Sequence, residues 1–304
     1  MEGTMDRNGI FISLVAQLDK LARHNRQGSY RTKERYYEAM KRFCRFLAEE
    51  FHLQKLANIS GKHLTAYVLR MQAEEKAAST IKTELAAIRF FHDKIDRPRY
   101  KLPDNNELAV TLERRRFGEQ DRTWSRGEYE RFLSFCSEHG RPDFADLAQL
   151  TYHLGLRIHE CFRIDTAMAD AVLRDGVLTI KGKGGKVRTI PIEDPCVLEL
   201  LRHWREQTPR GHKLFVPPGL PTDSSILAFQ QFLIYARPSV QDRGSVRPMT
   251  HHGLRHTYAA RKYQELTASG KSELEAHLEV SRLLGHNRAE VTDIYLASID
   301  RDFL

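Results

Sequence analysis

Cysteine and long apolar runs are scarce in this sequence of 304 residues, and each scarcity excludes a class of protein. The 4 cysteines are scattered and form no C-x-x-C pair, so neither a disulfide framework nor a cysteine zinc site is indicated. This usage fits a reducing cytosol, and we expect a cytoplasmic protein. No apolar run approaches the roughly 18–20 residues of a membrane helix, and the polar start MEGTMDRNGI shows no signal peptide. The cysteines are Cys44, Cys136, Cys161 and Cys196.

A histidine metal site is not indicated either. His252 and His256 lie four residues apart on a predicted helix, and His251 adjoins them. A metal site needs a third ligand, and no cysteine or carboxylate stands nearby at a useful spacing. We therefore expect neither a metal nor another cofactor.

Positive charge is unevenly distributed along the chain. The sequence has 48 Lys and Arg against 40 Asp and Glu, a net charge of +8. Residues 1–117 contain 23 basic and 15 acidic side chains and hold the whole excess, whereas residues 118–304 contain 25 of each. This segregation indicates a polyanion-binding module ahead of an electrically balanced one. A solvated basic face on a helical domain would give the same count.

Apolar residues at helical spacing predict a four-helix bundle in the first third of the chain. We expect the third helix to begin at Ser60 and the fourth to be capped by Ser79. Periodicity alone indicates a bundle and says nothing of its ligand. The predicted inward stripes are Leu14, Leu18 and Leu21, then Tyr36, Met40, Phe43 and Leu47, then Leu64, Tyr67 and Met71, and finally Ile81, Leu85, Ile88 and Ile95.

A break separates this bundle from the rest. The segment DRPRYKLPDNNE contains Pro98 and Pro103, which cannot continue a helix. We place a helical domain at residues 1–113, a linker at 114–123 and a second domain at 124–304. The second domain opens on Ser125 and Glu128, whose S-x-x-E spacing is a capping box.

The second domain is predicted to be helical with a small sheet. A helix in DFADLAQLTYHLG should end at Gly155. The stretch VLRDGVLTIKGKGGKVRTIPI alternates apolar and polar residues around Asp175-Gly176 and again around Gly182–Lys186. It predicts a small antiparallel sheet with two turns. The fold class is therefore mainly α with a small antiparallel β-sheet.

Two further helices are expected near the end of the chain. HHGLRHTYAARKYQEL should form a helix that ends by Gly270, and Ser272 with Glu275 makes a second capping box. A final helix should begin near Ala289 and present Tyr295.

Side chains suited to attack on a phosphodiester occur in the second domain. Tyr295 can supply an oxygen nucleophile. Arg157 and Arg255 can form planar, bidentate clamps on phosphate oxygens. The groups that can move protons or donate hydrogen bonds are His252, His286 and Lys183.

The motifs around these residues resemble those of the tyrosine recombinase, or phage integrase, family. Each motif alone is a weak signal, but five in the family's order are improbable by chance. The resemblance covers roughly residues 123–299 and, more loosely, the helical region before them. The motifs are GLRIHE with Arg157 and Glu160, GKGGK with Lys183, HGLR with His252 and Arg255, LGH with His286, and IYL with Tyr295.

The resemblance implies a two-domain, Xer-like or mobile-element enzyme. Its first domain would be a SAM-like helical core-binding domain, and its second a mixed α/β catalytic domain. Such enzymes cleave and rejoin DNA through a 3′-phosphotyrosine, pass through a Holliday junction during strand exchange, and use neither metal nor ATP.

The resemblance also implies roles for individual residues. Tyr295 would be the nucleophile and His252 its base. Lys183 would protonate the leaving 5′-oxygen, although Lys181 and Lys186 are close neighbours on the same turn. The remaining expected roles are clamps on the phosphate for Arg157 and Arg255, a hydrogen bond to the phosphate for His286, and orientation of a neighbouring side chain for Glu160.

The implied partners are double-stranded DNA, a homotetramer on two DNA sites, and accessory DNA-bending or directionality proteins in a nucleoid-associated location. Two other functions use the same fold. A type IB topoisomerase has the same nucleophile and clamps, and a silent DNA-binding regulator has the fold without the chemistry. The two-domain layout favours a recombinase over the first, and the complete residue set favours it over the second.

Overall fold

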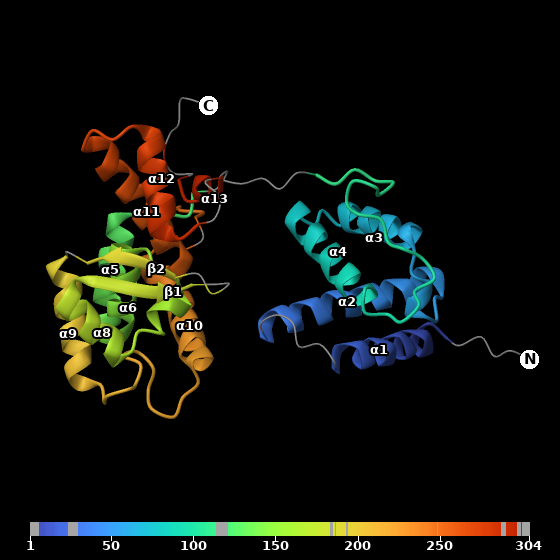
Figure 1. Ribbon diagram of the computed structural model, residues 1–304, viewed down its shortest axis with the longest axis horizontal. Coiled ribbons are helices and arrows are strands. Elements are labelled where there is room, and N and C mark those ends of the chain that lie inside the picture. Colours follow the sequence, from blue (N-terminus) through green and yellow to red (C-terminus); the bar gives the residue numbers. More distant parts are fainter. Residues whose placement is uncertain are drawn as a thin grey trace, which may run out of the picture. The chain divides into compact units, whose positions relative to one another are not determined.

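The computed structural model divides into two compact units, residues 1–115 and 116–304. Helices dominate both units and a small sheet lies in the second, which confirms the predicted fold class (Figure 1). Within the described parts of the chain, none of the helices combines the length and the apolar character needed to cross a membrane. The structure describes residues 6–23, 30–113, 121–182, 185, 187–192, 194–247, 249–286, 290–296 and 299. Most of the predicted linker, residues 114–120, lies outside them.

The N-terminal unit packs its helices around one apolar core. Leu14, Phe43 and Leu85 come from different helices, and each is fully buried in this core. The apolar stripes predicted from periodicity are confirmed except at Ile95, because their other members are helical and are buried in this cluster or packed against it. Ile95 packs against the core from the bend that follows the last helix of the unit. The elements are α1 (Arg7–Arg23), α2 (Tyr30–Phe51), the 3-10 turn η1 (Leu56–Asn58), α3 (Gly61–Ala73) and α4 (Ala78–His92).

Of the two helix starts predicted here, one is confirmed and one is wrong. Ser60 is the N-cap of α3. Helix α4 begins at Ala78 and has Ala77 at its N-cap, so Ser79 lies in its first turn. The chain turns sharply through Glu75, whose φ is 52°, and the Thr80 N–H already donates to the Ala77 carbonyl at 2.8 Å. This tight connection starts the helix two residues earlier than a serine cap would.

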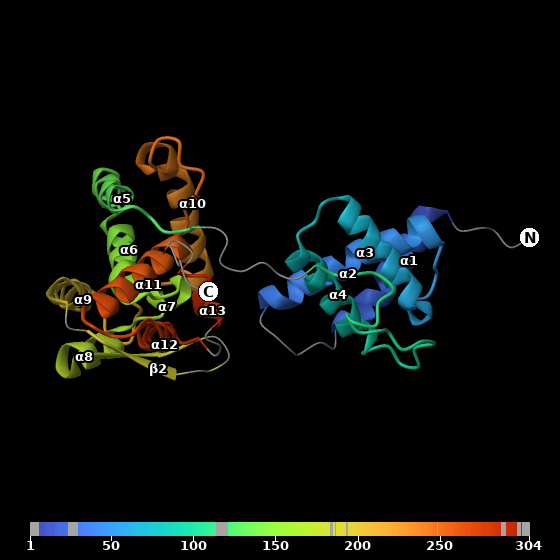
Figure 2. The same ribbon diagram turned by 90° about the horizontal axis from the view of Figure 1, so that it is seen from above.

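The C-terminal unit is built around α11, which packs against α6 on one side and α12 on the other (Figure 2). Ser125–Glu128 and Ser272–Glu275 form the two predicted capping boxes. The helices are α5 (Arg126–Glu138), α6 (Pro142–Leu154), α7 (Ile158–Cys161), α8 (Thr166–Asp175), α9 (Pro195–Gln207), α10 (Thr222–Val240), α11 (His251–Ala268), α12 (Glu273–Leu284) and α13 (Glu290–Asp293).

The sheet is an antiparallel pair, β1 (Val177–Lys181) and β2 (Val187–Pro191). Its register runs from the pair Val177 and Pro191 to the pair Lys181 and Val187. The turn predicted at Asp175-Gly176 is wrong. The residues before it form α8, in which Asp165 caps the start by accepting from the Met168 N–H, and Gly176 ends it in the left-handed conformation. Val172, one of the apolar positions that suggested a strand, lies on the buried face of this helix with Thr166 and Ala169.

The last helix is shorter than predicted. Helix α13 ends at Asp293, and Tyr295 lies in the turn that follows it. The amides of both Tyr295 and Leu296 donate to the Thr292 carbonyl, at 2.9 and 3.2 Å. The nucleophile candidate is therefore held by a turn and not by a continuing helix.

Gly155 closes α6 in a conformation and a space that favour glycine. Its φ is 62°, and a Cβ added there would lie 2.4 Å from the ring of Tyr258. We expect Gly155→Ala to lower the free energy of unfolding by roughly 3 kcal/mol or more, because left-handed strain and overpacking add. Urea unfolding measures this loss.

Gly140→Ala is the matched control, since Gly140 has a φ of 65° and open space around the added carbon. It should lower the free energy of unfolding by roughly 1–2 kcal/mol, from left-handed strain alone. Equal losses for the two variants would contradict the role of Tyr258.

Candidate active site

Arg255 is a fully buried cation at the centre of the C-terminal unit. It lies in α11, and its guanidinium donates to two carbonyls, Gly155 at the end of α6 and Leu284 at the end of α12, the latter at 2.5 Å. Both helix ends are closed by left-handed glycines. The carboxyl end of a helix carries partial negative charge, so these carbonyls stabilise the cation without a carboxylate.

The charge of Arg255 persists at neutral pH. Burial first, and then the charge of Arg157, lowers the pKa of its guanidinium to about 10. Its Nε has no hydrogen-bond partner among the described residues.

Glu160 joins two more arginines beside this centre. Its carboxylate is fully buried and accepts from the Arg157 amide at 2.8 Å and from Arg157 Nη1 at 3.0 Å. Two nitrogens of Arg188 donate to its two oxygens at 2.9 and 2.7 Å. Burial alone would raise the pKa of the Glu160 carboxyl, but the hydrogen bonds and charges of the two arginines outweigh it and lower the pKa to about 2.

The hydroxyl of Tyr295 lies 3.1 Å from Nε2 of His252. Tyr295 is 6% exposed, and its ring stacks on His256 with the ring centres 4.4 Å apart. The guanidinium carbon of Arg255 lies 5.5 Å from the centre of the same ring. The structure thus brings the predicted nucleophile, base and one predicted clamp together from α11 and the C-terminal turn.

His286 lies between Arg255 and the C-terminal segment. Its Nε2 is 3.4 Å from Arg255 Nη2, and its Nδ1 is 2.9 Å from Oγ1 of Thr292. Burial, followed by the charges of Arg255 and Arg157, lowers the pKa of His286 to about 3.

His252 is also held neutral, although part of it is open to solvent. Its pKa is lowered to about 4, first by desolvation, since neighbouring groups displace water, and then by the charges of Arg255 and Arg157. A neutral imidazole can accept a proton at pH 7.

The three neighbouring histidines of α11 have separate surroundings. His251 pairs with Oγ1 of Thr151 at 2.8 Å, His252 contacts Tyr295, and His256 lies under the tyrosine ring. Nowhere in the described ranges do three His, Cys, Asp or Glu side chains form a group that could hold a metal ion.

A pocket of about 310 Å³ opens beside these residues. Three guanidiniums and one imidazole contribute to its wall, so its chemistry suits an anion. It is lined by Arg157, Gly182, Val187, Arg188, Thr189, Arg282, Gly285 and His286.

Lys183 and Lys186 lie outside the described residues, whereas Lys181 ends β1. Sequence reasoning missed two members of the site, Arg188 and Thr292. Arg188 sits in an alternating strand that looks like an ordinary surface strand. Thr292 lies three residues before Tyr295, and this short separation is the sequence feature that could have identified it.

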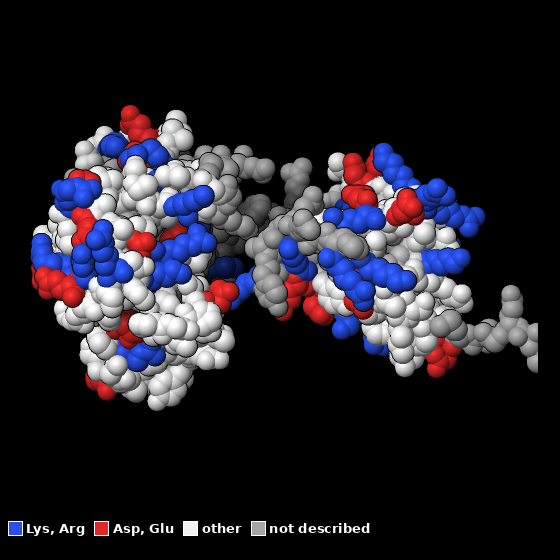
Figure 3. Space-filling view, turned by 60° about the horizontal axis from the view of Figure 1, so that its bottom comes forward, with Lys and Arg blue, Asp and Glu red and all other residues white. Residues whose placement is uncertain are grey.

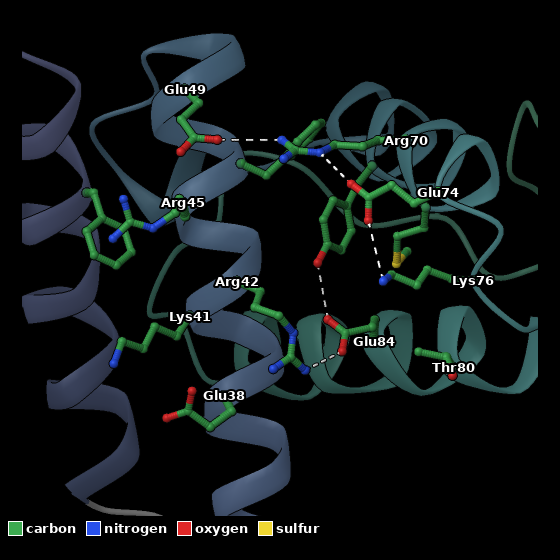
Figure 4. A pocket seen from close by; sticks show the side chains of 14 residues that line it. Glu38, Lys41, Arg42, Arg45, Glu49, Arg70, Glu74, Lys76, Thr80 and Glu84 are labelled. Atoms are coloured by element: carbon green, nitrogen blue, oxygen red, sulfur yellow. Dashed lines mark hydrogen bonds and ion pairs between the residues drawn. The ribbon is translucent and has the colours of Figure 1, made fainter.

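The N-terminal unit has a pocket of its own, of about 560 Å³, lined mainly by α2, α3 and α4 (Figure 4). Glu84 is 5% exposed there and pairs with Arg42 at 2.5 Å, while the Tyr67 hydroxyl donates to it at 3.2 Å. Arg70 pairs with Glu74 at 3.1 Å. Acidic side chains thus pair with two of the cations in the wall of this pocket, Arg42 and Arg70.

Family models match most of the chain. The model of the phage integrase family matches residues 124–301, and that of the phage integrase N-terminal region matches residues 12–99. Among curated proteins, tyrosine recombinase XerD of Halalkalibacterium halodurans is 25% identical over 278 residues, which are 88% of this chain and 87% of the relative. XerD of Xanthomonas axonopodis pv. citri is 32% identical over 161 residues, 49% of this chain and 48% of the relative.

Solved structures share the fold at low identity. A lambda integrase dimer bound to a COC′ core site has a TM-score of 0.65 at 17% identity. The match covers 96% of this chain and 79% of the integrase chain. The XerH recombinase bound to palindromic difH substrate has a TM-score of 0.62 at 22% identity, with 92% and 80% covered.

Glu160→Gln should flatten the acid side of the stability curve. The carboxyl has a pKa of about 2 in the folded protein against an ordinary value of 4.5. Its contribution to the free energy of unfolding is therefore complete above pH ~4.5 and is lost as the pH falls towards ~2. The whole contribution is about 3 kcal/mol. Urea unfolding between pH 5 and 2.5 measures the slope.

Glu199→Gln is the control, because Glu199 pairs with Arg202 on the exposed surface. It should leave the slope almost unchanged. A wild-type slope in Glu160→Gln would contradict the low pKa.

Proposed function

The chain belongs to the phage integrase, or tyrosine recombinase, family, and from that premise we propose that it is a site-specific recombinase that cleaves and rejoins DNA through a 3′-phosphotyrosine. The observation that carries the proposal is the contact of the Tyr295 hydroxyl with His252 at 3.1 Å, next to the buried charge of Arg255. The type IB topoisomerase alternative is not favoured, because the relatives matched along most of the chain are recombinases.

In the cleavage step, the Tyr295 oxygen forms a bond to phosphorus while the bond from phosphorus to the 5′-oxygen breaks. His252 takes the phenolic proton. Its low pKa keeps Nε2 unprotonated at neutral pH, so the group is ready to accept. A 5′-hydroxyl from a partner duplex reverses the step, because the phosphotyrosine retains the bond energy.

We propose that Arg157, Arg255 and His286 stabilise the negative charge that is added in the transition state. Electrostatic stabilisation by fixed donors is the largest contribution to many such reactions. The pocket lined by Arg157 and His286 and the unpaired Nε of Arg255 support this assignment. Glu160 orients Arg157 through its direct hydrogen bond.

We assign protonation of the leaving 5′-oxygen to Lys183. Its neighbour Gly182 lines the same pocket as Arg157. The family motif supports this choice over Lys181 and Lys186.

Double-stranded DNA is the proposed partner. The lambda integrase neighbours are a dimer on a core site and a tetramer on a Holliday junction, and we propose a homotetramer on two DNA sites for this chain, with accessory DNA-bending or directionality proteins. Lys and Arg side chains are spread over the visible face of each unit (Figure 3). The basic excess of residues 1–117 supports DNA binding by the proposed core-binding domain, residues 1–113, which a linker at 114–123 joins to the catalytic domain, residues 124–304.

Tyr295→Phe should abolish covalent attachment to DNA, because it removes the nucleophilic oxygen alone. The measurement is a denaturing gel after incubation with a nicked suicide substrate, and DNA affinity should stay within about twofold. Tyr235→Phe is the control, since Tyr235 is 63% exposed on α10, and it should form the adduct normally. An adduct in Tyr295→Phe would refute the assignment.

Removing positive charge from α2 should weaken the salt dependence of DNA binding. Arg31→Gln, Arg35→Gln and Lys41→Gln together should lower the slope of log K against log[salt] by up to about 2.7, since each lost phosphate contact removes about 0.9. The matched triple variant of the catalytic unit is Arg210→Gln, Lys213→Gln and Lys271→Gln. Equal slopes for the two triple variants would show that the basic excess is not a binding surface.

A further inference from the structure

Thr292 links the proposed nucleophile to His286. Its side chain is fully buried, and its Oγ1 lies 2.9 Å from Nδ1 of His286. Its carbonyl accepts the Tyr295 amide at 2.9 Å. One residue thus holds the backbone of the tyrosine and the ring of the histidine.

The contact between His286 and Arg255 determines which ring nitrogen of His286 carries the proton. A guanidinium is a donor with no acceptor, so His286 Nε2 must accept from Arg255 Nη2 at 3.4 Å. A neutral imidazole has one N–H, and here it must be on Nδ1, donating to the Thr292 hydroxyl. The low pKa of His286, due to burial and then to Arg255 and Arg157, agrees with a neutral ring.

This arrangement has a consequence for phosphate binding. With its proton on Nδ1, neutral His286 has nothing to donate from Nε2. A phosphate that draws the donors of Arg255 to itself would leave Nε2 free to take a proton. A hydroxyl can both donate and accept, so rotation of the Thr292 O–H lets it donate to a deprotonated Nδ1. Solvent water supplies the proton that Nε2 takes up and accepts the one that Nδ1 releases, so the protons balance and the charge of the ring is unchanged.

We propose that Thr292 is a positioning residue: its hydroxyl accepts from Nδ1–H of His286 in the free protein, where Arg255 sets that tautomer, and donates to Nδ1 in the Nε2–H form when a phosphate binds. The inference rests on the proposed role of His286 at the phosphate. Serine in place of Thr292 would retain the hydroxyl, whereas valine has nearly the same shape and presents a methyl group to Nδ1.

The first test needs no catalysis. Two-bond ¹H–¹⁵N spectra of DNA-free protein with labelled histidine report which nitrogen carries the proton, and His286→Gln assigns the signal. We expect Nδ1–H in the wild type, Thr292→Ser and Thr292→Val alike, because Arg255 still donates to Nε2. In Thr292→Val, which lacks the acceptor, the Nδ1 proton should resonate further upfield and exchange faster with water than in the wild type and Thr292→Ser. Nε2–H in the wild type, or an Nδ1 proton whose resonance and exchange rate are unchanged in Thr292→Val, would overturn the proposal. Neither result depends on whether Tyr295 forms an adduct.

The second test separates positioning from folding. Thr292→Val should slow single-turnover cleavage of the nicked substrate roughly tenfold, as expected when a buried donor loses its partner, with DNA affinity unchanged. Thr292→Ser should stay within about twofold of the wild type. In a His286→Ala background, Thr292→Val should cause no further loss. The same loss in that background would show that Thr292 does not act through His286. Should Thr292→Val fail to fold, the wild-type tautomer and the rate of Thr292→Ser decide the question.

Discussion

The site depends on a buried guanidinium that is held by helix ends. Arg255 is fully buried, and its described partners are the carbonyls that end α6 and α12, together with His286. A buried cation normally needs a carboxylate, but a carboxylate would neutralise it. Partial charges at two helix ends stabilise the cation and leave its formal charge available for a phosphate. The glycines that end these helices, Gly155 and Gly285, are therefore part of the site.

Glu160 sets the charge balance around this centre. It is one carboxylate shared by Arg157 and Arg188, while Arg255 has no bond to it. Three guanidiniums against one carboxylate leave two positive charges in excess. In the proposed reaction a phosphodiester has one negative charge and gains another in the transition state, so the excess would match the charge of the transition state. The carboxylate fixes two side chains that would otherwise repel each other.

The sequence predicted the parts of the site that stand in motifs and missed those that depend on tertiary contact. Tyr295 and His252 are 43 positions apart, and their contact follows from the family motifs and not from periodicity. Capping boxes such as Ser125–Glu128 were read correctly, because their chemistry is local. Asp175-Gly176 was misread as a hairpin turn, since a buried helix face and a strand can share a short apolar pattern. Arg188 was missed because its partner, Glu160, is 28 positions away.

The charges of the arginines help to keep the histidines of the site neutral. Desolvation by neighbouring groups and the arginine charges lower the pKa of His252 to about 4 and that of His286 to about 3. The positive charge of the site is thus carried by arginines, which do not titrate near neutrality. Nε2 of His252 keeps its lone pair for the Tyr295 hydroxyl across the same range. In the proposed mechanism, clamping of the phosphate and acceptance of the proton are therefore separate functions on separate side chains, and neither requires a histidine to change charge before DNA binds.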